Sequence, residues 1–141
     1  MLKILIVDDH ALFREGLHYV LDKLEEQVVI LEAADFGRAM KQLVDNPDLD
    51  LVLLDLNMSD TDGFTALDSM SKNHSTVPVV ILSTSNQQDH VRRALASGAL
   101  GYIPKDSANT VMQQALRLVL SGGIYVPPTM ASDKNKMLLT S

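Results

Sequence analysis

Short apolar runs alternate along the chain with segments in which apolar residues recur every three or four positions. The runs are rich in β-branched residues and end abruptly, which is typical of strands buried on both faces. They cover residues 3–7, 28–31, 51–54, 77–82 and 101–103. Between the runs, the apolar residues follow the period of amphipathic helices.

Two of these helical segments have clear core stripes. One comprises Phe13, Leu17, Val20, Leu21 and Leu24, and the other comprises Val111, Ala115, Leu118 and Val119. Helix-ending residues follow the second, fourth and fifth segments: Pro47, Gly98, and the pair Gly122 and Gly123. The alternation predicts an α/β fold, a doubly wound five-stranded parallel sheet with strand order 2-1-3-4-5 and helices on both faces.

Length and composition fit one such domain. The chain has 141 residues, 46% of them hydrophobic, which is enough for one sizeable core. After Tyr125 the chain becomes polar, and Pro127 and Pro128 interrupt regular structure. We therefore expect residues 1–123 to form the domain and residues 124–141 a linker.

Charge, cysteine content and the absence of long apolar runs narrow the functions. The chain has no cysteine, which excludes disulfides and zinc-thiolate sites. A net charge of -6 argues against direct binding to DNA phosphates. No apolar run reaches the roughly 18 residues of a membrane span and no signal peptide opens the chain, so we expect a cytoplasmic protein without membrane contact.

Polar residues follow four of the predicted strands. Asp8 and Asp9 come after the first strand, Asp55 after the third, Ser83 after the fourth and Lys105 after the fifth. In an open parallel sheet, the carboxyl ends of the strands border the binding crevice. If the first and third strands are neighbours, three carboxylates converge there.

Carboxylates this close together require a counter-ion, and Mg²⁺ suits carboxylate oxygens together with a phosphate. The backbone carbonyl of Asn57 is a further candidate ligand. With the cation in place, Asp55 could act as a nucleophile toward an anionic phosphoryl group. Lys105 and the Ser83 hydroxyl would then contact the phosphoryl oxygens.

Taken singly, each of these residues has an ordinary structural explanation. Asp8 and Asp9 could cap the helix that comes after them. Asp55 could be a turn residue, Ser83 a cap or loop hydroxyl, and Lys105 a solvated charge. Their joint occurrence at the ends of four strands favours a shared site.

Five stretches resemble the receiver domain of response regulators: residues 4–10, 55–58, 62–63, 81–83 and 98–106. The resemblance extends from residue 3 to about residue 125 and implies a flavodoxin/CheY-like fold. It also implies phosphorylation of Asp55 by a partner histidine kinase, with the same strand-end residues and the Asn57 carbonyl around Mg²⁺ and the phosphoryl group. Such a domain is a phosphoacceptor with at most weak self-phosphorylation and self-dephosphorylation, not an enzyme.

Finer features are similar to the LuxR/NarL-type transcription regulators. These are Asp-Asp-His at residues 8–10, Lys105 followed by Asp106, and Gly-Gly-Ile-Tyr-Val-Pro-Pro at residues 122–128. This resemblance implies that the linker leads to a C-terminal helix-turn-helix domain, and residues 139–141 resemble the opening of that domain. DNA would then be bound only through a domain beyond residue 141.

The loop after Asp55 departs from the family pattern. Ser59 stands where receivers commonly have proline, and Asp60 and Asp62 make the loop unusually acidic. Loop rigidity and metal affinity can therefore differ from those of other receivers.

Two hypotheses concern signalling. Phosphorylation would draw the Ser83 hydroxyl toward the phosphate and let Tyr102 turn inward, which would change the surface formed by the fourth helix, the fifth strand and the fifth helix. The last helix also has a second apolar stripe, which either covers the sheet or forms a homodimer interface. It consists of Met112, Leu116 and Leu120.

Three other functions fit parts of the pattern. A phosphatase of the haloacid dehalogenase type also forms an aspartyl phosphate, but it needs a second aspartate as general acid where this chain has Asn57. A flavodoxin-like nucleotide binder needs a glycine- or hydroxyl-rich first loop, and Asp8 and Asp9 would repel its phosphate. A stand-alone receiver that acts only through protein contacts would differ solely in the chain beyond residue 141.

Overall fold

The computed structural model describes residues 1–74, 76–85 and 87–128. Its sheet consists of β1 (Leu2–Val7), β2 (Val28–Ala33), β3 (Leu51–Asp55), β4 (Val79–Ser83) and β5 (Gly101–Pro104). Neighbouring strands pair in parallel in the order β2-β1-β3-β4-β5, which confirms the predicted sheet. Each strand begins and ends within two residues of its predicted run.

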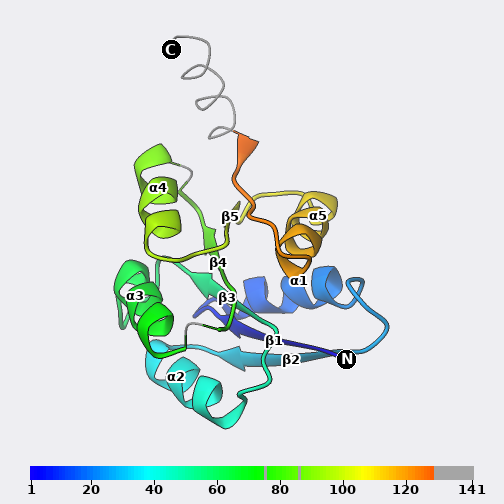
Figure 1. Ribbon diagram of the computed structural model, residues 1–141. Coiled ribbons are helices and arrows are strands. Elements are labelled where there is room, and N and C mark those ends of the chain that lie inside the picture. The colour runs from blue at the N-terminus through cyan, green and yellow to red at the C-terminus, as the bar shows by residue number, and fades with distance from the viewer. Residues whose placement is uncertain (75, 86, 129–141) are drawn as a thin grey trace.

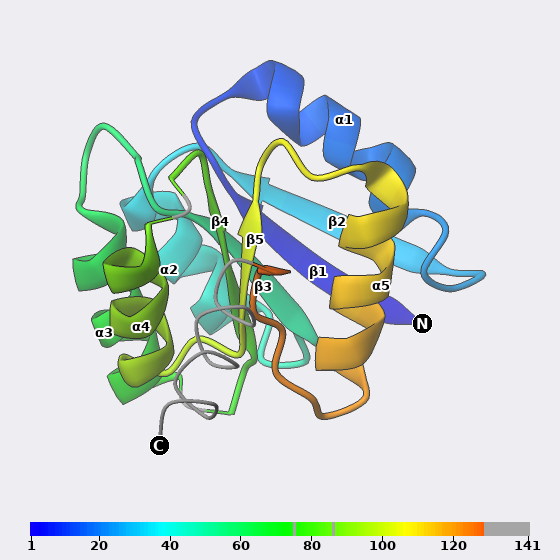
Figure 2. The same cartoon turned by 90° about the horizontal axis from the view of Figure 1, so that it is seen from above.

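Helices cover both faces of the sheet. They are α1 (Ala11–Leu21), α2 (Phe36–Asp45), α3 (Gly63–Asn73), α4 (Gln88–Ala96) and α5 (Asn109–Leu120). Figure 1 shows α2, α3 and α4 on one face and α1 and α5 on the other, and in Figure 2 the same two groups lie on opposite sides of the strands. Among the described residues, no helix has the length and apolar character that crossing a bilayer requires.

Successive side chains of the central strands enter two different cores. In β1, Leu5 and Val7 pack in the core beneath α2, α3 and α4, whereas Ile4 and Ile6 pack in the core beneath α1 and α5. All four side chains are fully buried. Burial on both faces explains why the strand sequences are continuous apolar runs instead of alternating ones.

The core stripe predicted for α5 is partly wrong. Two of its four residues, Val111 and Leu118, are 37% and 43% exposed. Met112 and Leu116 of the second stripe are buried and face the sheet instead, and Leu120 is partly buried against the same core. The second stripe therefore covers the sheet, and Met112 and Leu116 are not available for a dimer interface.

The chain after α5 stays attached to the edge of the sheet. The Tyr125 N–H donates to the carbonyl of Leu100 at 3.0 Å, and the Tyr125 carbonyl accepts from the N–H of Tyr102 at 3.2 Å. The side chain of Tyr125 packs against the core beneath α1 and α5. Contacts with the sheet therefore continue past Gly123, whereas residues 139–141 lie outside the described residues.

Candidate functional site

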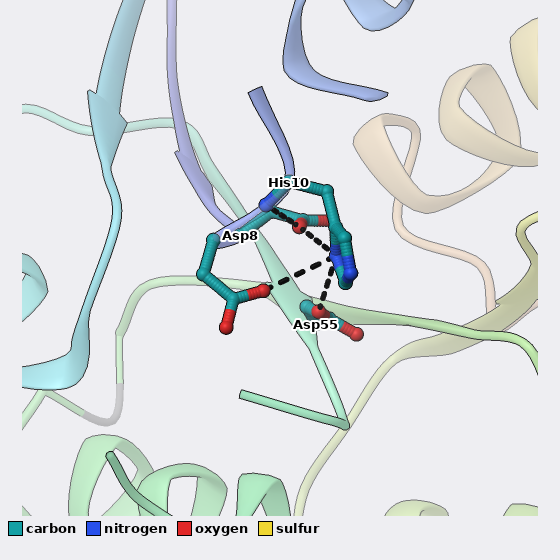
Figure 3. Close-up of side chains that lie close together, drawn as sticks. Asp8, His10 and Asp55 are labelled. Atoms are coloured by element: carbon teal, nitrogen blue, oxygen red, sulfur yellow. Dashed lines mark hydrogen bonds and ion pairs between the residues drawn. The ribbon is translucent and has the colours of Figure 1, made fainter. Parts of the chain in front are cut away.

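The strand order brings the polar ends of β1 and β3 together. Val7 pairs with Leu54, so Asp8 and Asp55 follow at the same edge of the sheet. Both residues are 0% exposed. Figure 3 shows both of these residues beside the His10 ring.

Asp8, Asp9, His10 and Asp55 form an acidic cluster in which one potential ligand atom of each residue lies within 4.8 Å of the others. The Nδ1 atom of His10 lies 3.0 Å from Asp8 Oδ1, 3.1 Å from Asp9 Oδ1 and 3.8 Å from Asp55 Oδ2. His10 was not expected as a site residue from the sequence. Its position directly after the acid pair was the one available signal.

Three buried oxygens of the acidic cluster accept no hydrogen bond of good geometry from the described residues: Asp8 Oδ2, Asp9 Oδ1 and Asp55 Oδ2. Burying anionic oxygens that accept no well-aligned hydrogen bond is unfavourable. A hard divalent cation satisfies such oxygens, and Mg²⁺ binds one or two carboxylates together with waters and a phosphate oxygen. The ligand set of the acidic cluster therefore fits Mg²⁺.

Lys105 brings a positive charge to the same point. Its Nζ lies 2.8 Å from Asp8 Oδ2 and 3.3 Å from Asp55 Oδ2, and its side chain is 10% exposed. The same atom lies 4.6 Å from the centre of the Phe13 ring. The backbone N–H of Lys105 donates to the Ser83 carbonyl at 2.8 Å, which ties the start of the loop after β5 to the end of β4.

Burial raises the pKa of Asp55 above its ordinary value, and the Asp8 carboxylate raises it further. Two contacts oppose this rise. The Asn57 N–H donates to Asp55 Oδ1 at 3.1 Å, and both this hydrogen bond and the Lys105 ammonium lower the pKa of Asp55. Desolvation is the largest of these effects, so the charged form of Asp55 is destabilised in the folded protein. A cation beside it would relieve that cost.

Ser83 and Tyr102 meet at the ends of β4 and β5. Ser83 is fully buried, and its Oγ accepts from the Ser85 N–H at 3.0 Å. Tyr102 is also fully buried, and its hydroxyl donates to the Ser85 carbonyl at 2.5 Å. Burial raises the pKa of Tyr102. Tyr102 thus occupies the inward position that was expected only after phosphorylation.

The acidic loop after β3 directs its carboxylates to helix ends and not into the acidic cluster. Asp60 Oδ2 accepts from the Phe36 N–H at the start of α2, at 3.0 Å. Asp62 is the N-cap of α3 and accepts a backbone N–H in its first turn at 3.3 Å. Because helix N-termini attract negative charge, these two acids stabilise α2 and α3. The Ser59 N–H donates to Asp9 Oδ2 at 3.2 Å, which links the loop to the cluster.

Gly63 allows the same loop to close tightly. A Cβ atom at this position would lie 2.5 Å from both Cα and the carbonyl oxygen of Leu56. The Gly63 N–H donates to that carbonyl at 3.1 Å. Only glycine permits this close approach, so Gly63 helps to hold the backbone after Asp55.

Arg14 is a second residue that was not expected from the sequence. Its Nη1 donates to the backbone carbonyl of Asp8 at 2.6 Å, and its Nε lies 3.2 Å from Glu32 Oε1. Arg14 therefore ties the backbone of the acidic cluster to both α1 and β2. An arginine one turn into a helix carries no sequence signal for such a role.

The family model of the response regulator receiver domain matches residues 4–117. The chain belongs to this family. The glycerol metabolism activator of Pseudomonas putida is 40% identical over 128 residues, which cover 91% of this chain and 58% of that protein. The nitrate/nitrite response regulator protein NarP of Escherichia coli (strain K12) is 34% identical over 120 residues, which cover 85% of this chain and 55% of that protein.

A solved structure of a LuxR family DNA-binding response regulator from Silicibacter pomeroyi matches this receiver with a TM-score of 0.81 and 29% identity, covering 92% of this chain and 99% of that one. These findings confirm the receiver resemblance and the LuxR/NarL-type relatives. This chain is thus the phosphoacceptor signalling domain of a two-component response regulator. It spans little more than half the length of the two curated relatives.

Proposed function

We propose that Asp55 is the phosphoacceptor of this receiver and that a histidine kinase is the phosphoryl donor. A carboxylate oxygen of Asp55 forms the new O–P bond while the N–P bond of the kinase phosphohistidine breaks. The bonding electron pair stays on the imidazole nitrogen, which takes up a proton. The observation that carries the proposal is the group of three buried carboxylate oxygens that accept no hydrogen bond of good geometry, two of them within ion-pair distance of the Lys105 ammonium.

Asp8, Asp9, Asp55 and the Asn57 carbonyl are the proposed holders of Mg²⁺. When bound, this cation neutralises the charge that accumulates between the carboxylates and the phosphoryl oxygens. Carboxylate and carbonyl oxygens suit Mg²⁺ better than an imidazole does, so His10 is not included among the ligands. The Lys105 ammonium and the Ser83 hydroxyl would hold the phosphoryl oxygens on the other side.

The proposal is tested by intact-mass analysis after incubation with Mg²⁺ and acetyl phosphate. Wild type should gain one phosphoryl adduct, and Asp55→Asn should gain none. Asp60→Asn is the matched control, because Asp60 lies in the neighbouring loop but bonds to α2 and not to the acidic cluster. An adduct of equal yield on Asp55→Asn, or no adduct on a Mg²⁺-bound wild type, would contradict the assignment.

The proposed output is transcription control through a LuxR-type DNA-binding domain in the longer protein. Similarity to response regulators described as transcriptional or DNA-binding supports this, and the net charge of -6 argues against DNA binding by this unit itself. Fluorescence anisotropy with the regulated DNA should show binding by a chain extended past residue 141 and none by residues 1–141. Equal binding by both would contradict the proposal, and no binding by either would favour a stand-alone receiver.

A homodimer through α5 remains part of the proposal in a narrower form. The apolar residues that α5 leaves exposed are Val111 and Leu118, both on the outer face of the helix. Sedimentation with and without a phosphoryl mimic should show an increase in mass that Leu118→Glu abolishes. A monomer under both conditions would exclude this interface.

A further inference from the structure

Ser85, two residues after Ser83, connects three elements of the fold. Its N–H donates to Ser83 Oγ at 3.0 Å, and its carbonyl accepts from the Tyr102 hydroxyl at 2.5 Å. Its own Oγ lies 2.9 Å from Nδ1 of His90, in the first turn of α4. The end of β4, the middle of β5 and the start of α4 are therefore all bonded to one residue.

The bond between Ser85 and His90 links the loop before α4 to the first turn of that helix. The N-cap residue of α4, Gln87, makes no capping bond with its side chain. Ser85 Oγ instead accepts from the Gln87 N–H at 3.3 Å. The same hydroxyl can also bond to Nδ1 of His90, as donor or as acceptor according to the tautomer of the imidazole.

A second contact fixes the orientation of the His90 ring. The ring lies edge-on to Phe64, with 5.9 Å between the ring centres and an angle of 64° between the planes. Phe64 is buried at the start of α3 and lies 4.1 Å below the guanidinium of Arg93, one helical turn after His90. The position and rotation of the His90 ring are thus determined by both the loop after β4 and the start of α3.

We propose that His90 is a positioning residue that transmits a displacement of Ser83 to helix α4. The inference rests on the proposed phosphorylation of Asp55. When Ser83 moves toward a phosphoryl group, Ser85 follows because its N–H is bonded to Ser83 Oγ. Tyr102 receives this movement through the Ser85 carbonyl, and α4 receives it through His90.

Two substitutions separate the hydrogen bond from the ring packing. His90→Phe keeps an aromatic ring beside Phe64 and removes the nitrogen that bonds to Ser85. His90→Asn removes the ring but keeps a polar atom at the δ position, which is where Nδ1 lies. Ser85→Ala removes the partner hydroxyl while leaving both backbone bonds of Ser85 in place.

The experiment adds beryllium trifluoride with Mg²⁺, as a phosphoryl mimic, and records amide chemical shifts of Ser83, Tyr102 and α4. In His90→Phe the shifts along α4 should fall at least twofold relative to wild type, while those at Ser83 are retained. His90→Asn should restore most of the α4 shifts. Adding Ser85→Ala to His90→Phe should cause no further loss, since both variants break the same bond.

Full α4 shifts in His90→Phe would overturn the inference, and so would a loss in His90→Asn as large as that in His90→Phe. Wild type without any shift at Ser83 would overturn the proposed function, and the inference with it. Retained shifts at Ser83 in every variant therefore distinguish a broken connection to α4 from a failure of the phosphoacceptor site.

Discussion

Replacing Asp55 with asparagine is expected to stabilise the fold when divalent cations are absent. The acidic cluster brings Asp55 within 4.8 Å of ligand atoms of Asp8 and Asp9. At this upper limit of separation and an effective dielectric constant of about 20, each pair of charges repels by at least about 3.5 kcal/mol. The Lys105 ammonium, 3.3 Å from Asp55 Oδ2, offsets about 5 kcal/mol of this repulsion.

About 2 kcal/mol of net repulsion remains, and the burial of the charge adds to it. The hydrogen bond from the Asn57 N–H compensates for part of the sum. Asp55→Asn should therefore gain about 1–2 kcal/mol in the free energy of unfolding, or roughly 3–8 °C in Tm. Adding Mg²⁺ should close or reverse the difference, because a wild type that binds the cation gains about 1.4 kcal/mol at tenfold excess over its Kd, whereas the variant lacks the Asp55 carboxylate.

The difference in stability between Asp55→Asn and wild type should vary with pH, because the pKa of Asp55 is raised. In the wild type the cost of the buried charge is complete above the raised pKa, and it diminishes as the pH falls from there toward the ordinary value of 3.8. The wild type therefore loses this cost on acidification, whereas Asp55→Asn has no such group. The advantage of the variant should be largest near neutral pH and vanish near about pH 4.

Thermal and urea unfolding followed by circular dichroism measure these differences, in EDTA and in excess Mg²⁺. Asp60→Asn is the control, since it removes a carboxylate that bonds to the start of α2 and should lose up to about 1 kcal/mol under both conditions. If Asp55→Asn is no more stable than wild type in EDTA at neutral pH, Lys105 already balances the cluster and the calculated repulsion is wrong.

Three further predictions concern stability and are measured by urea unfolding in EDTA. Gly63→Ala should lose about 2 kcal/mol, because its Cβ would lie 2.5 Å from backbone atoms of the loop after β3. Gly16→Ala, whose Cβ meets no atom within 4 Å, should gain roughly 0.5–1 kcal/mol, and equal effects at the two glycines would contradict the close approach. Leu116→Ala should lose about 2–4 kcal/mol in the free energy of unfolding and Leu118→Ala less than about 1 kcal/mol, since these residues are 1% and 43% exposed. A larger loss for Leu118→Ala would favour the core stripe predicted from the sequence, which includes Leu118. Lys105→Met should lose about 3 kcal/mol because two buried carboxylates lose their cation, and a loss near zero would mean that water screens them.

The sheet and the placement of Asp8 and Asp55 could be predicted because both depend on the strands alone. Strands buried on both faces are continuous apolar runs, and the residue after each run lies at a known edge of a parallel sheet. The core face of α5 could not be predicted in the same way. Its two candidate stripes are adjacent on the helix, and the position of the sheet determines that Met112 is buried and Val111 exposed. Helical periodicity alone does not specify where the sheet lies.

The acids of the β3–α3 loop show a second limit of sequence reasoning. A divalent cation and a helix N-terminus both attract carboxylates, so the acidity of residues 59–62 is compatible with either. The distance from the strand end decides. Asp8, Asp9 and Asp55 lie at the ends of β1 and β3 and stay together in the acidic cluster, whereas the carboxylates of Asp60 and Asp62 reach the first turns of α2 and α3. Because Asp60 also joins this loop to α2, the backbone beside Asp55 is held by a helix that contributes no residue to the acidic cluster.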